Sequence, residues 1–443
     1  MSQKVEKSSL TGLRVKVSKH GSPRIAQLLQ NTVFGTEGKL RYRQKEIADR
    51  IKSQSNVQFI EILKGNRVFG TAGMTNRNVL HGDDYMQTLY VRYLSFAHAF
   101  KSKNSTNFST LKRKGKNRSV LREMVLDEIS AHFEQPFIEA DKQGLFYAFV
   151  ESANINSRNL CLSMGFEAAR KVETLLFSRF NPTQQKSISN IAEYEQDEVK
   201  KKLSEFYKDY SFYFEDQIFR TGFYLVKKEN GKIIGGIRAI PVNWQLVEYP
   251  GFEGWLMQDV LPYLPFTNRL FQPGSFKFLA FDYAWHAPNL EHIIPELMAH
   301  CCSLFGINMG MIWGDTNSEL IKNLKSSNEL GFVHSVSGSV YADLMIRPIN
   351  FIKMDGGFEN FEENTKAESK VEIPNKQGSI KKSKKENPDT PTSNTEEGES
   401  VPESIDAKSN TDNGKSESIQ RDEFASLKDV LKKPIFVSAL DMT

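Results

Sequence analysis

Two halves of this chain repeat the same order of β-rich and helical segments. Residues 56–75 form two β-rich runs around Lys-Gly-Asn, and residues 221–243 form two such runs around Glu-Asn-Gly-Lys; both patterns are typical of hairpins. In each half a helical segment closes on Gly-Phe, at residues 165–166 and 331–332, and a strand follows. Repetition of a whole element order at this scale indicates a duplicated domain.

Hydrophobic periodicity predicts helices at 24–34, 39–55 and 119–135, a third strand within 86–100, and a buried strand at 144–152. A short helix and a last strand complete the first half. The predicted fold class is α/β (α+β), with two tandem mixed-sheet domains, flanking helices and a disordered C-terminal tail. The predicted parts are a flexible start (1–20), a first domain (21–181), a linker (182–195), a second domain (196–356) and the tail (357–443).

Charge is distributed unevenly along the chain. The formal net charge is +4, yet residues 361–443 hold 13 Lys/Arg and 17 Asp/Glu with few aromatic residues. Such a composition cannot offset the entropy of ordering, which predicts disorder. Residues 424–443 regain apolar side chains, so they are either a short docking motif for a protein partner or a frayed end.

Several classes of protein are excluded by what the chain lacks. Its three cysteines, Cys161, Cys301 and Cys302, have no zinc-ligand spacing, so no metal is expected. The start has no apolar signal region, and no apolar run is long enough for a membrane span. A cytoplasmic protein is therefore expected. A small positive excess suits an anionic ligand better than nucleic acid.

The most unusual segment is "LKRKGKNRSVL" at 111–121, which follows a predicted strand and loop and begins a predicted helix. Amide groups of a first helical turn and the helix dipole favour bound anions, and a glycine allows close approach of the backbone. A pyrophosphate cradle is one interpretation; a solvated basic helix cap is the other. The cradle would consist of Arg113, Lys114, Gly115, Lys116, Asn117, Arg118 and Ser119.

This context resembles the GNAT superfamily of acyl-CoA-dependent N-acyltransferases. The pyrophosphate loop of that family has the pattern Arg/Gln-x-x-Gly-x-Gly/Ala, to which "KRKGKNRS" is similar, with Asn117 at the second glycine. A later family pattern, Asn-x-x-Ala-x-x-Leu-Tyr-x-x-x-Gly-Phe, is similar to "NINSRNLCLSMGF", which begins at Asn154. Here Cys161 falls on the family tyrosine. The second half lacks the glycine loop, so the resemblance implies that acyl-CoA binds the first domain alone.

The resemblance also implies a mechanism. An amine attacks the thioester of acetyl-CoA or another acyl-CoA, and a backbone amide at a strand bulge polarises the thioester carbonyl; we expect that bulge at Leu94 to Phe96. Glu151, which ends the strand before Asn154, is the expected base, and Glu61 is the alternative. Cys161 stands where relatives often carry the acid that protonates the departing thiolate.

The amine acceptor, a small molecule or a protein or peptide, is expected between the two domains. The departures at Asn117 and Cys161 leave a second hypothesis open, in which the chain is an inactive scaffold whose tail recruits partners. Nucleic-acid binding through the basic segment is a third hypothesis, and the acidic tail argues against it.

Overall fold

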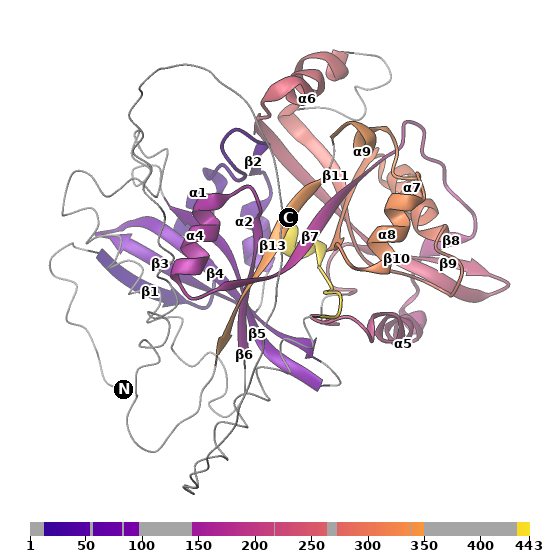
Figure 1. The fold of residues 1–443 in the computed structure, drawn as a ribbon, viewed down its shortest axis with the longest axis horizontal. Helices are drawn as coiled ribbons and strands as arrows, with labels where there is room; N and C mark the ends of the chain where they lie inside the picture. Colours follow the sequence, from indigo (N-terminus) through magenta and orange to yellow (C-terminus); the bar gives the residue numbers. More distant parts are fainter. Residues whose placement is uncertain are drawn as a thin grey trace, which may run out of the picture. The chain divides into compact units, whose positions relative to one another are not determined.

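The computed structural model describes residues 13–53, 56–81, 84–96, 144–216, 218–263, 273–337, 339–349 and 432–443. These residues form one mixed β-sheet that runs through both halves of the sequence (Figure 1). From one edge to the other, its strands are β1 (Leu13–Ser18), β3 (Val57–Lys64), β4 (Arg67–His81), β5 (Asp84–Phe96), β6 (Gly144–Glu151), β13 (Val340–Ile349), β7 (Glu167–Ser178), β12 (Met309–Asp315), β11 (Phe276–His286), β10 (Lys232–Glu248), β9 (Phe223–Glu229) and β8 (Ile188–Asn190).

The two halves exchange strands at the centre of this sheet. Strand β13 comes from the second half, yet it pairs antiparallel with β6 on one side and β7 on the other. Strand β7, from the first half, then pairs with β12. A further strand, β2 (Arg41–Gln44), pairs with β10 of the second half. Neither half therefore completes its hydrogen bonding without the other.

Helices pack on both faces of the sheet, and the alternation of strand side chains separates the two layers. On β3, Phe59 packs with the first two helices, whereas its neighbour Ile60 packs with the helix after β6. The helices are α1 (Pro23–Gln30), α2 (Ile47–Ser53), α4 (Ile155–Ser163), α5 (Gln196–Tyr207), α6 (Gly251–Trp255), α7 (Ile293–Phe305), α8 (Glu319–Ser326), α9 (Phe332–Ser337) and α11 (Ala439–Met442).

The C-terminal segment, Lys432–Thr443, lies on the face that also carries α5. It is drawn in yellow in Figure 1 and lies against the middle of the sheet. Ile435 and Phe436 are 1% and 5% exposed. The prediction of a disordered tail over 357–443 is therefore wrong for these last residues, because their apolar side chains find an aromatic cluster to pack against. The remainder of that tail lies outside the described residues.

Most predicted elements appear where hydrophobic periodicity places them, with three exceptions. The start predicted to be flexible over 1–20 contains β1, which pairs with β3. The linker predicted over 182–195 contains β8, which pairs with β9. The helix predicted over 39–55 divides into β2 and α2, because Tyr42 and its neighbours pair with a strand of the other half. That partner is distant in sequence, so periodicity alone gives no sign of it. The helix predicted at 119–135 lies outside the described residues.

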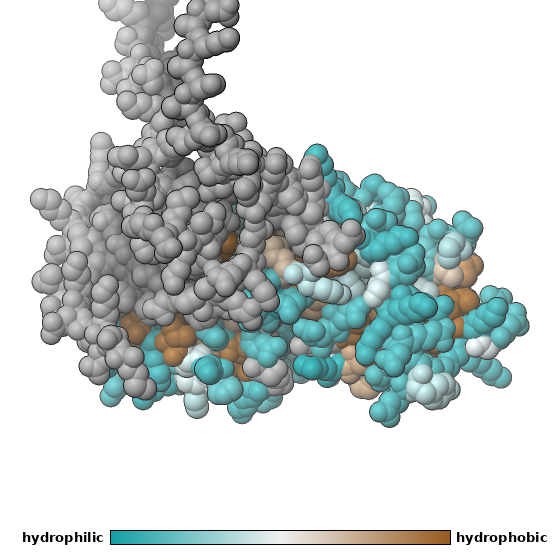
Figure 2. Space-filling model, turned by 90° about the horizontal axis from the view of Figure 1, so that it is seen from below, coloured by the Kyte–Doolittle hydropathy of each residue, from teal (hydrophilic) through white to brown (hydrophobic). Residues whose placement is uncertain are grey.

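The surface of the described residues is mainly hydrophilic on the face shown in Figure 2, where apolar side chains occur in small separate groups. Within the described residues, no helix has both the length and the apolar character needed to cross a membrane.

Candidate functional site

In the first half, pairing between β5 and β6 ends before either strand does, and we call the place between them the notch. These parallel strands pair from Gln87 with Gly144 to Tyr90 with Tyr147, and the pairing stops there. Both strands continue beyond it, β5 to Phe96 and β6 to Glu151. Where two strands continue without pairing, the backbone N–H and C=O groups on their facing edges have no partner in the other strand. Such groups need another hydrogen-bond partner.

A β-bulge lies on the β5 side of this notch. On β4 only one residue separates Thr71 from Gly73, whereas on β5 two residues, Tyr93 and Leu94, separate their partners. Tyr93 has φ of 56°, in the left-handed region that a bulky side chain rarely adopts. The bulge overlaps the range Leu94 to Phe96 expected from the sequence and begins one residue earlier. Bulges of this kind turn backbone groups away from the ladder.

The β6 side of the notch carries the predicted Glu151 and Asn154. Glu151 is partly buried, and its Oε2 accepts a hydrogen bond from the Thr36 hydroxyl at 2.7 Å. Asn154 caps α4, because its Oδ1 accepts from the Ser157 amide at 3.0 Å. The start of a helix, with the positive end of its dipole, thus follows the Glu151 carboxylate by three residues.

Cys161 lies on α4 and is buried in the apolar cluster that contains Met164, Phe166 and Phe146. Burial raises the pKa of the Cys161 thiol to about 11. The side chain is therefore a neutral thiol near pH 7. Its predicted role as an acid remains a prediction.

The residues of the predicted cradle, Arg113, Lys114, Gly115, Lys116, Asn117, Arg118 and Ser119, lie outside the described residues. The alternative base, Glu61, is buried on β3, where its Oε1 accepts from the Ser18 hydroxyl at 3.1 Å. That bond ties the carboxylate to the neighbouring edge strand β1.

Sequence reasoning missed the residues that line the opposite side of the site. The C-terminal segment reaches β4 and β5 there: Arg77 forms an ion pair with Asp441 at 2.6 Å, and the Tyr90 hydroxyl donates to the Asp441 carbonyl at 2.5 Å. Arg92 donates to the Leu440 carbonyl at 2.7 Å. The apolar run at 424–443 is the sequence signal that could have indicated this docking.

Three polar side chains converge on the last residue of the segment. The Thr443 carbonyl accepts from Gln44 at 2.9 Å, from Arg92 at 3.5 Å and from Arg50. Arg92 and Gln44 are both buried. Nearby, the Tyr42 ring stacks on Trp244 of β10 at 3.6 Å. Burial raises the pKa of Tyr42, and the charge of Glu151 adds to the effect, which places Glu151 within electrostatic reach of this cluster.

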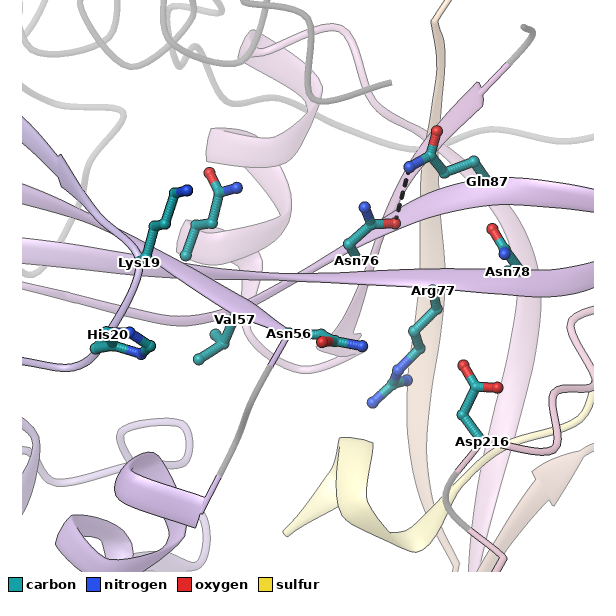
Figure 3. A pocket seen from close by; sticks show the side chains of 10 residues that line it. Lys19, His20, Asn56, Val57, Asn76, Arg77, Asn78, Gln87 and Asp216 are labelled. Carbon is teal, nitrogen blue, oxygen red and sulfur yellow. Dashed lines mark hydrogen bonds between the residues drawn. The ribbon is translucent and has the colours of Figure 1, made fainter. Parts of the chain in front are cut away.

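A polar cavity of about 450 Å³ lies beside the site, over β3, β4 and β5. Figure 3 shows Asn76 and Gln87 on one side of β4, joined by a hydrogen bond of 3.1 Å, and Arg77 pointing to the other side toward Asp216. The lining includes neither Glu151 nor the bulge residues. Arg77 is the residue shared by this cavity and the docked segment.

No family model matches the sequence, and no curated protein matches it. Several solved structures are similar to the chain. Saccharomyces cerevisiae N-myristoyltransferase with bound myristoyl-CoA has a TM-score of 0.48 and 8% identity, over 76% of this chain and 83% of that one.

Two bacterial structures are also similar to the chain. A GCN5-related N-acetyltransferase from Anabaena variabilis has a TM-score of 0.37 and 12% identity, over 75% of this chain and 72% of that one. The corresponding protein from Sphaerobacter thermophilus has a TM-score of 0.38 and 9% identity, over 75% and 95%.

Proposed function

We propose that the chain is an acyl-CoA-dependent N-acyltransferase that transfers an acyl group, acetyl in the simplest case, to an amine. The observation that carries the proposal is the notch between β5 and β6. One of its walls is the bulge at Tyr93 and Leu94, and the other ends in Glu151 and the capped start of α4. The basic segment around Gly115 would hold the pyrophosphate of the donor.

Each step of the reaction would be assisted by a different group of the chain. An amide of the bulge donates to the thioester oxygen as negative charge develops on it, which is the most effective use of a fixed donor. Glu151 takes a proton from the acceptor ammonium, directly or through a water. The amine nitrogen then forms a bond to the acyl carbon, the carbon–sulfur bond breaks, and the thiolate of CoA takes up a proton. Cys161 on α4 is the candidate donor of that proton, and it is reprotonated by the second proton that the nitrogen loses as it becomes an amide.

The acceptor would approach from the face where β2 crosses to the second half. Thr36, Tyr42 and Glu151 lie together there, and Tyr42 stacks on Trp244 of the second half. An acceptor amine at this place would meet a carboxylate beside aromatic rings, a setting that attracts ammonium groups. Both a small amine and the amino group of a peptide fit this description.

Thermal unfolding of the full chain with a panel of acyl-CoA donors tests the proposal. A ligand that binds the native state at 100 times its Kd stabilises it by about 2.7 kcal/mol, so acetyl-CoA, a longer acyl-CoA or free CoA should raise the Tm. Gly115→Glu should abolish the shift, because it brings bulk and negative charge to the pyrophosphate. Gly274→Glu is the matched control, since a side chain at Gly274 meets open space.

No shift with any donor would favour the scaffold hypothesis, which the departures at Asn117 and Cys161 support. A shift that survives Gly115→Glu would show that the pyrophosphate is held elsewhere.

A further inference from the structure

The second half contains a notch that corresponds to the first, element by element. Parallel pairing of β11 with β12 stops at Phe281 with Ile312, and both strands continue. Between Gly236 and Arg238 the register with β10 shifts, which leaves a bulge on β11. Tyr283 lies in that bulge with φ of 45°.

The residues after the second notch also correspond. Strand β12 ends at Asp315, and three residues later Ser318 caps α8 by accepting from the Ile321 amide. In the first half, β6 ends at Glu151, and three residues later Asn154 caps α4. The carboxylate at the strand end and the capped helix are thus present in both halves.

The second notch is occupied by the chain itself. The Ile435 amide donates to Asp315 Oδ2 at 3.1 Å, and the Ala439 amide donates to Asp282 Oδ2 at 2.8 Å. The Ser438 hydroxyl also donates to Asp282, at 3.0 Å. Two buried carboxylates on the two splayed strands therefore hold backbone and hydroxyl groups of one short segment.

Side-chain packing anchors the same segment. The Phe436 ring lies against the rings of Tyr213, Phe214 and Tyr283, with Tyr283 nearest at 4.7 Å between centroids. On the other side of the segment, Ser211 exchanges backbone hydrogen bonds with Pro434 and Phe436, both at 2.8 Å. Backbone hydrogen bonds and one aromatic anchor thus hold the part of the segment before α11, as in the recognition of extended peptides.

We propose that residues 434–443 are the resident ligand of the second notch. This peptide segment occupies the second notch as the acyl donor would occupy the first. On this account the second half binds peptide and not acyl-CoA. The Arg77–Asp441 pair is then a positioning contact, which carries the end of the segment to Gln44 and Arg92 at the first site. The inference rests on the proposed function in its assignment of the first notch to an acyl donor.

Two variants of the full chain should weaken the binding of residues 434–443 without displacing the segment from the second notch. Ser438→Ala removes the hydroxyl that reaches Asp282 and caps α11, and Asp441→Asn removes the charge that pairs with Arg77. Matched controls are Ser326→Ala, on an exposed hydroxyl of α8, and Asp197→Asn, which breaks an exposed pair with Lys200.

Amide hydrogen exchange over residues 435–443 is the first readout. Both variants should exchange about 10- to 100-fold faster than the original chain, the range expected for loss of a hydrogen bond to a charged group, while both controls should not. Acyl-CoA should bind the original chain and both variants at one site per chain with similar Kd, and acyl transfer should fall in both variants.

Unchanged exchange in both variants, or two acyl-CoA molecules bound per chain, would overturn the inference. Absence of acyl-CoA binding to the original chain would instead end the proposed function, and exchange over 435–443 would still decide whether the segment is held as described. Ser438→Ala removes one oxygen atom, so it keeps the test open if Asp441→Asn fails to fold.

Discussion

Tyr93 and Tyr283 occupy corresponding bulges in the two halves, and both have positive φ, 56° and 45°. Each lies on the strand whose parallel partner stops pairing a few residues earlier. A bulky residue in the left-handed region is costly, and such strain persists where the surrounding structure imposes it. The two halves therefore share this strained bulge as well as the order of their strands and helices.

Replacement of the Glu151 carboxylate tests the proposed base. Glu151→Gln should lower kcat by roughly 10²- to 10⁴-fold, the usual contribution of general acid–base catalysis. The Kd for acyl-CoA should stay the same, because the amide keeps the shape of the side chain and can still accept from Thr36. Steady-state kinetics with binding by calorimetry check both. Glu167→Gln, at an exposed position on β7, is the control; equal rates in the two variants would rule out Glu151 as the base.

Burial of Cys161 should appear in the pH dependence of stability. Because the pKa of the folded thiol is raised to about 11, the unfolded thiol ionises at lower pH and binds fewer protons between the two values. This contribution is complete below the unfolded pKa and is lost as pH rises toward 11. It amounts to roughly 2 kcal/mol.

Urea unfolding of the original chain and of Cys161→Ala between pH 8 and 11 measures that contribution. The stability difference between them should narrow by about this amount as pH rises. A constant difference would show that the thiol ionises alike in both states.

The buried pair Arg238–Asp282 holds the second half together around the docked segment. Both side chains are fully buried, and their atoms lie 2.7 Å apart between Nε and Oδ1. Arg238→Met should cost about 3 to 5 kcal/mol, because it leaves an uncompensated carboxylate.

A second substitution, Asp282→Leu, tests whether Asp282 also holds the docked segment in addition to pairing with Arg238. In the double variant Arg238→Met/Asp282→Leu only part of the lost stability should return, since Ser438 and Ala439 also lose their acceptor. Denaturant unfolding of the single and double variants gives the coupling energy. Full recovery would show that Asp282 contributes nothing to holding the segment.

Local patterns in the sequence were enough to predict much of the fold. The apolar run of β6, the helix that closes on Gly165 and Phe166, and the repeated hairpins all follow from short-range periodicity, which reports burial directly. Glu151 could be predicted as a candidate site residue because it ends a buried strand, and strand ends collect chemistry in open α/β sheets. Asn154 came from the family resemblance, and the roles of both residues stay predictions.

Long-range pairing explains what the sequence did not reveal. Strand β13 pairs with β6 across almost 200 residues of chain, and the Arg77–Asp441 pair joins residues still further apart. Nothing in the neighbourhood of Tyr42 indicates that it pairs with β10. In the sequence, Arg77 and Arg92 look like ordinary polar residues of exposed strands. Only the structure shows that the C-terminal segment covers them.

The most direct test of an acyl donor in the first notch is amide hydrogen exchange of the full chain with and without saturating acyl-CoA. Exchange should slow at residues 93–96 and 154–157, on the two walls of the notch, and should not change at the corresponding residues 283–286 and 318–321. Unchanged exchange at 93–96 and 154–157 under saturating donor, or protection confined to the second half, would contradict the binding of an acyl donor in the first notch.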